Sequence, residues 1–403
     1  MRAAADMRVA ILTSAREARD WCAARRHTYE QRLAVLVGID TGFDAPDGRD
    51  QAAALLAEWA AAAGCDCELV PTSAGDTLVA RLAGEGRGRV VLLGHHDTVF
   101  ARGTAAARPL RRDGDVVYGP GVADMKGGLL VGLTALEALA RGVRSFASVE
   151  LISVPDEETR TKPFAVIDRV RGADAVLVLE CGRENGDLVA GRKTGAWIHL
   201  EVEGRAAHAG TEPELGRSAV RGLCHEILRC EALDGARPGL TVIAGTVSGG
   251  TIANVVPAHA ETMLDVRAPA RGDFDWAVAE IARIGSYDGL RVRVEDAGTW
   301  PGIEQGAAGR ALLDESRRIA AGLGVALDGQ TSGGMSDGCW TAAIGIPTLD
   351  GFGPVGGNDH SPDEYARLDS VPARCGMLTG LCEAIGGGLL AGADHEGVSG
   401  TRR

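Results

Sequence analysis

VVLLGHHDTVF, residues 90–100, joins four consecutive apolar residues to a turn that carries two histidines and an aspartate. A short run of Val and Leu predicts a strand buried on both faces, as in parallel sheets covered by helices. Sites in α/β proteins lie beyond the carboxyl ends of such strands. In extended chain His95 and Asp97 point to the same side, so Asp97 is placed to orient a metal-binding His95. A His–Asp pair on a plain surface turn is the alternative interpretation of this motif alone.

Short apolar strands alternate with helices on the carboxyl side of this stretch. We expect a helix at 127–141 and strands at 149–154 and 175–179. Fully apolar strands separated by helices predict an α/β core, with a largely parallel sheet between helices.

The pattern changes after residue 192, where the strands alternate apolar and polar residues. The order of elements over 193–301 is β-α-β-β-α-β, which predicts an inserted ferredoxin-like α+β domain. We therefore expect a discontinuous core domain, residues 1–192 and 302–403, interrupted by a second domain at 193–301.

Composition excludes several classes of partner. The net charge of −13 gives no basic face for nucleic acid, and no stretch approaches the ~20 apolar residues of a membrane span. The nine cysteines are scattered and odd in number, which favours reduced thiols over a disulfide framework. The N-terminal apolar run is too short for a signal peptide. We expect a soluble, cytoplasmic protein that binds neither nucleic acid nor membrane.

Four more segments carry acids or a histidine at loops and strand ends. Asp124 lies in a glycine-rich segment before a helix, Pro155–Glu158 reads PDEE after a strand, Glu180 ends the next strand, and His360 lies in the loop GGNDHSPDEY. Singly, Asp124 could cap a helix and PDEE could be a solvated acidic loop. Taken together, two histidines and three carboxylates are sufficient ligands for two zinc ions, with one glutamate to spare for proton transfer.

These segments, in this order, resemble the di-zinc exopeptidase family that contains glutamate carboxypeptidase, acetylornithine deacetylase and succinyl-diaminopimelate desuccinylase. The match is closest to the glutamate carboxypeptidase branch, through GHHDTVF, GPGVADMKGG, PDEE, the strand end at Glu180 and HSPDEY. The resemblance covers nearly the whole chain and implies a zinc-exopeptidase-like catalytic domain with an inserted lid and dimerisation domain. It assigns a role to each candidate residue: His95 and Glu180 bind one zinc, Glu158 and His360 bind the other, Asp124 bridges both, Asp97 orients His95, and Glu157 is the general base.

The inserted domain also resembles the family's lid. GRAAHAG (204–210) matches the motif whose histidine, here His208, stabilises the oxyanion from the same chain or from the dimer mate. Asn254 and Arg267 match the segments that bind the substrate carboxylate, and a guanidinium can donate two hydrogen bonds to it. The glycine turn at Gly333 and Gly334 would line the site.

Departures from the family pattern concern the substrate pocket. After PDEE the relatives usually continue with a small Gly-Ser turn, whereas this chain has the bulkier and more basic TRTKPF, residues 159–164. Arg160 and Lys162 could favour an acidic group on the substrate, or they could simply be solvated. Cys181-Gly182 and Met335 also replace the family's usual residues.

The function these features favour is hydrolysis of an amide bond next to a free carboxylate, with release of a C-terminal acidic amino acid from a small peptide or N-acyl amino acid. A deacylase of the acetylornithine type is the alternative, followed by a non-catalytic binding protein of the same fold. Two Zn²⁺ are expected, although His and carboxylate ligands also admit Co²⁺ or Mn²⁺. The expected partners are a small-molecule substrate with a free carboxylate and a second copy of the chain, bound through the lid. The acyl group, the physiological metal, the pathway and the chain that supplies His208 stay open.

Overall fold

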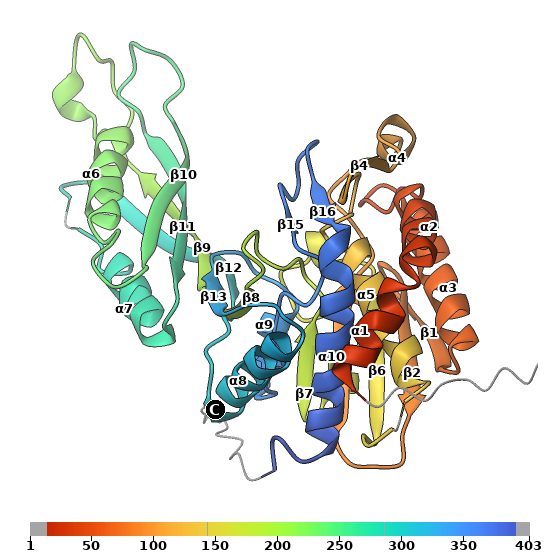
Figure 1. Ribbon diagram of the computed structural model, residues 1–403. Coiled ribbons are helices and arrows are strands. Elements are labelled where there is room, and N and C mark those ends of the chain that lie inside the picture. Colours follow the sequence, from red (N-terminus) through yellow and green to blue (C-terminus); the bar gives the residue numbers. More distant parts are fainter. Residues whose placement is uncertain (1–13, 143, 286, 392–403) are drawn as a thin grey trace, which may run out of the picture. The chain divides into compact units, whose positions relative to one another are not determined.

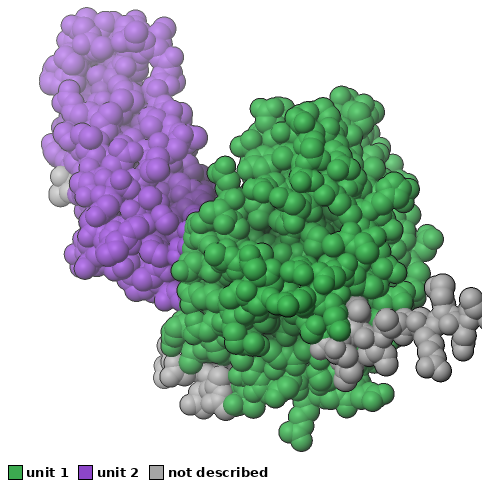
Figure 2. Space-filling model, viewed as in Figure 1, with its two compact units in different colours: residues 1–190, 305–330, 336–403 green, residues 191–304, 331–335 purple. Residues whose placement is uncertain are grey.

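The computed structural model describes residues 14–142, 144–285 and 287–391. The chain forms two compact units, shown in different colours in Figure 2. Unit 1 comprises residues up to Ala190, Gln305–Gln330 and Ser336 onward, and unit 2 comprises Gly191–Glu304 and Thr331–Met335. The boundaries therefore differ from the expected ones by a few residues, and the chain enters unit 2 a second time, at residues 331–335.

A six-stranded sheet forms the centre of unit 1, and Figure 1 labels its strands β1, β2, β6 and β7. The strand order is β1-β2-β6-β3-β7-β14. Strand β3 runs parallel to both β6 and β7, and β14 runs parallel to β7, as expected for an α/β core. The hairpin β1–β2 is antiparallel and adds one edge of the sheet. The bounds of these strands are β1 Asp66–Thr72, β2 Gly75–Ala83, β3 Arg89–His95, β6 Ser148–Val154, β7 Ala175–Val178 and β14 Thr348–Leu349.

Both faces of this sheet are buried along its central strands β3, β6 and β7. Alternate residues of β3 point to opposite faces, so Val90 and Leu92 join one apolar cluster while Val91 and Leu93 join another. The first cluster includes side chains from helices on one face of the sheet, and the second includes Phe164 from the segment after PDEE. The helices of unit 1 are α1 Ala15–Ala23, α2 Arg26–Val37, α3 Pro46–Ala62, α4 Thr104–Ala107, α5 Lys126–Leu139, α8 Ala307–Gly322, α9 Gly338–Ala343 and α10 Val371–Gly386.

A second, small sheet brings two distant loops of unit 1 together. Its order is β15-β16-β5-β4, so β16 pairs with β5 across a long stretch of sequence. The loop with Asp124 follows β5, and the loop with His360 lies between β15 and β16. The bounds of its strands are β4 Arg111–Asp113, β5 Val116–Tyr118, β15 Gly356–Gly357 and β16 Tyr365–Arg367.

Unit 2 has a four-stranded antiparallel sheet in the order β10-β11-β9-β12. Its elements follow one another as β9, α6, β10, β11, α7 and β12, which is the ferredoxin-like order expected for the insertion. Its apolar core includes residues from α6, α7 and the strands. The bounds are β9 Thr194–Glu203, α6 Ala219–Glu231, β10 Thr241–Gly249, β11 His259–Ala268, α7 Arg271–Ile281 and β12 Arg291–Trp300. The chain passes between the units along β8, Leu188–Arg192, and β13, Gly329–Ser332.

Among the described residues, no helix combines the length and the apolar character needed to cross a membrane.

Candidate metal centre

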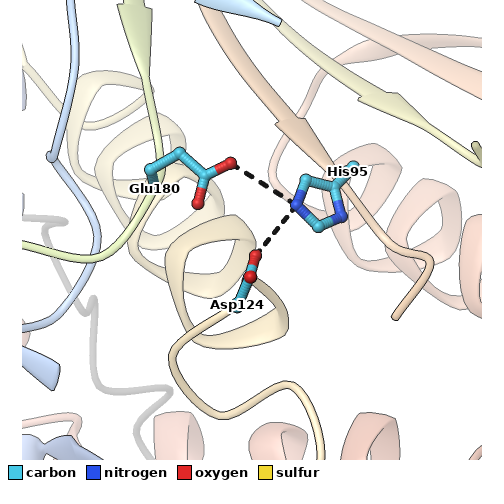
Figure 3. A group of neighbouring side chains, drawn as sticks. All are labelled: His95, Asp124 and Glu180. Carbon is cyan, nitrogen blue, oxygen red and sulfur yellow. Dashed lines mark hydrogen bonds and ion pairs between the residues drawn. The ribbon is translucent and has the colours of Figure 1, made fainter. Parts of the chain in front are cut away.

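One group of candidate ligands lies where strands β3 and β7 end. His95 is the last residue of β3, Glu180 follows β7, and Asp124 lies in the loop before α5. The Nε2 atom of His95 lies 3.0 Å from Oδ1 of Asp124 and 3.5 Å from Oε1 of Glu180 (Figure 3). Parallel strands bring their carboxyl ends to one edge of the sheet, which explains why His95 and Glu180 meet. Asp124 joins them from the loop between β5 and α5.

A second group shares Asp124 with the first. Nε2 of His360 lies 3.1 Å from Oδ2 of Asp124 and 3.2 Å from Oε2 of Glu158. Within each group the ligand atoms all lie within 4.8 Å of one another. The two oxygens of Asp124 thus face different histidines, which is the arrangement of a carboxylate that can bridge two cations.

Asp97 holds two parts of this centre together. Its Oδ1 lies 3.3 Å from Nδ1 of His95, whose ring also faces the backbone oxygen of Asp97 at 3.1 Å. Oδ1 and Oδ2 of Asp97 also accept hydrogen bonds from the backbone N–H groups of Glu157, at 3.1 Å, and Glu158, at 3.0 Å. The sequence pointed to the first contact through the two-residue spacing, but it gave no sign of the second.

Glu364 is a residue of the centre that sequence reasoning missed. Its buried carboxylate accepts hydrogen bonds from the backbone N–H groups of Gly121, Ala123 and Asp124, at 2.9 to 3.0 Å. A carboxylate that accepts several backbone hydrogen bonds fixes the shape of the loop that donates them. Glu364 therefore holds the loop that presents Asp124. The available signal was an acid in the same HSPDEY segment as His360.

The residues expected to bind substrate lie in unit 2, and two of them occur on paired loops. His208 forms an antiparallel bridge with Val255, and the N–H of Ala209 donates to the backbone oxygen of Asn254. Nδ1 of the exposed His208 accepts hydrogen bonds from the N–H groups of Gly210 and Thr211, both at 3.1 Å. A neutral imidazole whose Nδ1 accepts must carry its proton on Nε2, where it can serve as a donor.

Arg267 is already engaged within unit 2. Its Nε and Nη2 atoms donate to the two oxygens of Asp265, both at 2.8 Å, and Nη1 donates to the carbonyl of Gly333 at 2.8 Å. The carbonyl of Gly334 accepts from Arg192 at 3.0 Å. A guanidinium has five N–H groups, so Arg267 keeps two beyond these three bonds for a ligand.

The sequence of this chain is similar to those of known metallopeptidases, in agreement with the two groups of candidate metal ligands. The family model described as peptidase family M20/M25/M40 matches residues 91–384. Carboxypeptidase G2 of Pseudomonas sp. (strain RS-16) is 30% identical over 326 residues, which cover 78% of each chain. This chain belongs to peptidase family M20/M25/M40. It is therefore a hydrolytic enzyme, a metallopeptidase or amidohydrolase, and the alternative of a non-catalytic binding protein is set aside.

Other relatives and structural neighbours are named for different hydrolytic reactions. Succinyl-diaminopimelate desuccinylase of Stenotrophomonas maltophilia is 28% identical over 363 residues, 82% of this chain and 92% of the relative. The fold is also similar to the crystal structure of aminopeptidase PepT from Bacillus cereus, with a TM-score of 0.76, 22% identity, and coverage of 89% of this chain and 98% of that one. M20 peptidases are metal-dependent, and the two groups around Asp124 are candidate ligands.

Two candidate ligands of the centre, Glu180 and Glu158, are buried carboxyl groups with raised pKa values, and a bound cation would stabilise their charged forms. Burial, together with the nearby Asp124, raises the pKa of Glu180 to about 7. Burial likewise raises the pKa of Glu158, whose Oε1 is buried and has no hydrogen-bond partner among the described residues. Imidazole nitrogens and carboxylate oxygens are the ligands that zinc and similar divalent ions accept. The residues present therefore fit a pair of divalent cations.

Glu157 lies beside these ligands but belongs to neither group. Burial raises its pKa well above the usual range, and the carboxylates of Asp337, Glu180 and Glu158 add to the rise. A carboxyl group whose pKa moves toward neutrality can both accept and return a proton. Glu157 thus has the environment of a proton-transfer group.

The sequence allowed two interpretations of Arg160: a cation that binds an acidic group of the substrate, or a solvated surface charge. The structure shows that both are wrong. Arg160 is buried, and its guanidinium pairs with Asp156 and Asp337. Lys162 is exposed, as expected for a solvated residue.

Removing the carboxylate that holds the Asp124 loop should weaken metal binding. Glu364→Ala leaves three buried N–H groups without their acceptor and frees the loop, and changes around metal ligands typically cost 10- to 100-fold in affinity. We expect a fall of about that size, measured by competition with a chromophoric chelator. Glu85→Ala, an exposed glutamate of unit 1, is the matched control. Unchanged affinity in Glu364→Ala would contradict the holding role.

Metal loading should release protons at pH 7. Hydrogen bonds with Asp124 and Glu158 raise the pKa of His360 to about 11 in the metal-free chain, so its imidazole is protonated at pH 7. A histidine must lose that proton to bind a metal, so metal affinity should rise with pH up to that pKa. Calorimetric titration with zinc in two buffers of different ionisation enthalpy measures the protons released. Identical heats in both buffers would contradict this protonation state.

Proposed function

We propose that this enzyme hydrolyses the amide bond next to a free carboxylate and releases a C-terminal acidic amino acid from a small peptide or N-acyl amino acid. The observation that carries the proposal is the pair of ligand groups that share Asp124, with Glu157 beside them. The similarity to carboxypeptidase G2, at 30% identity, supports release of a C-terminal residue. The acidic side chain of that residue is proposed from the resemblance of the sequence motifs to the glutamate carboxypeptidase branch.

Two zinc ions are the proposed cofactors. His95 and Glu180 would hold one, Glu158 and His360 the other, and Asp124 would bridge them. When bound, such cations would supply Lewis acidity to the scissile carbonyl and would acidify a water molecule. Cobalt or manganese would suit the same nitrogen and oxygen ligands, so metal analysis decides the identity.

The proposed proton path runs through Glu157. Its carboxylate takes a proton from the attacking water and then gives it to the leaving amine. Asp97 supports this step, because it binds the backbone N–H of Glu157 as well as the ring of His95. In unit 2, the Nε2–H of His208 would donate to the oxyanion, and Arg267 with Asn254 would bind the substrate carboxylate, lined by Gly333 and Gly334.

A deacylase of N-acyl amino acids is the second candidate. Its support is the set of succinyl-diaminopimelate desuccinylases among the relatives, such as that of Stenotrophomonas maltophilia. Both candidates need the same metal ligands and the same base, and they differ in which side of the amide bond the enzyme selects. A cytoplasmic location, expected from the scattered cysteines, stays a prediction.

Replacing Glu157 should lower turnover strongly while it leaves the metals bound. Glu157→Gln keeps the size of the side chain but cannot take up a proton, and general-base catalysis typically contributes 10²- to 10⁴-fold. We expect kcat on N-acyl-glutamate to fall by about that factor, with the metal content from mass spectrometry near that of the parent protein. Glu85→Gln, on the surface of unit 1, is the matched control.

The same preparation tests the metals and the substrate. About two zinc per chain, with chelator-sensitive release of glutamate, would support the proposal. Turnover of neutral acyl amino acids ahead of acyl-glutamate and acyl-aspartate would favour the deacylase. Loss of zinc in Glu157→Gln would mean that the roles of Glu157 and Glu158 are interchanged, and the absence of metal after incubation with zinc would contradict the centre itself.

A second copy of the chain is the proposed partner, bound through unit 2. Strand β10 is an edge of the four-stranded sheet, and edge strands present unpaired N–H and C=O groups to a partner. Three large apolar side chains on β10 and α6 are exposed: Ile243 and Val247 on β10 are 54% and 62% exposed, and Leu228 on α6 is 68% exposed. Such residues are costly in water and favour burial in an interface.

Charges placed on this edge should dissociate the dimer. Leu228→Glu combined with Val247→Glu puts two carboxylates where apolar contacts are proposed, so sedimentation velocity should show monomers at concentrations where the parent protein is a dimer. Ile284→Glu, at an exposed apolar residue beyond α7, is the control and should stay dimeric. A parent protein that is already monomeric would contradict the interface.

A further inference from the structure

Arg160 lies two residues after Glu158, at the position where the chain departs from the small turn of its relatives. We propose that Arg160 is a positioning residue for the general base: it ties the segment that carries Glu157 to the start of α9. The inference rests on the base role proposed above for Glu157. It concerns a residue that belongs to neither group of candidate metal ligands and whose side chain donates to Asp156, Lys162 and Asp337.

All three guanidinium nitrogens of Arg160 are engaged by the protein itself. Nε donates to Oδ1 of Asp156 at 3.0 Å, and Nη1 donates to the carbonyl of Lys162 at 2.6 Å. Nη2 donates to both carboxylate oxygens of Asp337, at 2.7 and 2.9 Å. The side chains of Arg160 and Asp337 are each only 3% exposed. A cation so enclosed is unsuited to bind a substrate carboxylate, and its contacts are those of a structural link.

The segment around Glu157 has little structure of its own. Glu157–Thr159 form a single 3₁₀ turn, closed by one long hydrogen bond of 3.4 Å from the N–H of Arg160 to the carbonyl of Glu157. A single turn fixes several residues for one hydrogen bond, so it depends on contacts with the rest of the fold. Two carboxylates provide contacts that hold the turn. Asp97 accepts hydrogen bonds from the backbone N–H groups of Glu157 and Glu158. Asp156, directly before Glu157, accepts a hydrogen bond from Arg160.

Asp337 provides the fixed end of the link. It immediately precedes α9, is buried, and its backbone oxygen accepts from the N–H of Trp340 at the start of that helix. Helix α9 packs against β7 and β14 of the central sheet. Arg160 therefore joins the short turn that carries Glu157 to the rigid part of unit 1. Catalytic groups need this support, because a displacement of about 1 Å can cost about 100-fold in rate.

A single substitution cannot separate positioning from folding, because it leaves Asp337 buried without its cation. Breaking a buried ion pair by removing one partner is strongly destabilising, whereas replacing both partners with apolar residues is often neutral. The decisive variant is therefore Arg160→Met combined with Asp337→Leu. It restores an apolar contact but supplies no donor for Asp156 or for the carbonyl of Lys162. Arg160→Lys, which keeps the charge but has a single nitrogen, is the companion.

The measurements are kcat and KM on the best acyl amino acid, zinc per chain, and the denaturation midpoint. We expect the double variant to fold with the midpoint and zinc content of the parent protein, with kcat lowered about 10- to 100-fold and KM changed less than about threefold. Arg160→Lys should lie between the two. Arg171→Met, which removes only the exposed pair with Asp168, is the control and should match the parent protein.

Any other outcome for a folded double variant overturns the inference. A folded double variant with the kcat of the parent protein would make the pair a plain structural contact. A raised KM at unchanged kcat would make Arg160 a substrate-binding residue, and loss of zinc would show that it acts through Glu158. If the double variant fails to fold, unchanged kcat in Arg160→Lys overturns the inference and a tenfold loss with zinc retained supports it. Full activity in Glu157→Gln would instead refute the base assignment, independently of Arg160.

Discussion

The repulsion among buried carboxylates is the constraint on which the rest of unit 1 depends. Asp97, Asp124, Glu157, Glu158 and Glu180 gather at one edge of the central sheet, where burial makes each negative charge expensive. Coulomb repulsion at such separations costs several kcal/mol in a medium of intermediate dielectric constant, about 4 kcal/mol at 4 Å. The fold tolerates the cluster because partners stabilise the charges of Asp97 and Asp124, whereas the three glutamates have raised pKa values and take up protons more readily.

The acids differ in how their negative charge is stabilised and therefore in the direction of their pKa shifts. Asp97 is satisfied by backbone N–H groups and the ring of His95, which keep its pKa low despite its burial. Asp124 has a histidine on each oxygen, and its loop is shaped by Glu364. Glu158 and Glu180 have raised pKa values, and Oε1 of Glu158 has no hydrogen-bond partner among the described residues. Cations are what would stabilise both side chains as anions. Burial and the neighbouring carboxylates raise the pKa of Glu157, which belongs to neither ligand group, and both features agree with its proposed role as the general base.

Sequence reasoning predicted the candidate ligands because they follow a rule of the fold. His95, Glu158 and Glu180 come at or just after buried strands, and parallel strands end together, so their meeting needs no knowledge of loops. The roles of Glu364 and Arg160 could not be predicted in this way. Each acts through a partner far along the chain, 240 residues for Glu364 and Asp124, and 177 for Arg160 and Asp337. The β1–β2 hairpin was missed for a local reason: β1 is exposed and carries Pro71, so it lacks the apolar run of a buried strand.

The segment Ser332–Asp337 shows how one short stretch serves both units of the chain. Within unit 2, Arg267 binds the carbonyl of Gly333, and Arg192 binds those of Gly334 and Met335. Beyond the boundary at residues 335 and 336, Asp337 receives Arg160 within unit 1. Guanidinium groups suit this task because they donate in several directions at once and stay charged when buried. Gly333 and Gly334 present their carbonyls to these donors. The turn that the family resemblance associates with substrate binding is therefore only a few residues from Asp337. One short segment thus contains both the carbonyl that binds Arg267 and the carboxylate that binds Arg160, the proposed positioning residue for Glu157. A change in this segment would therefore reach the proposed carboxylate-binding residue and the proposed base together.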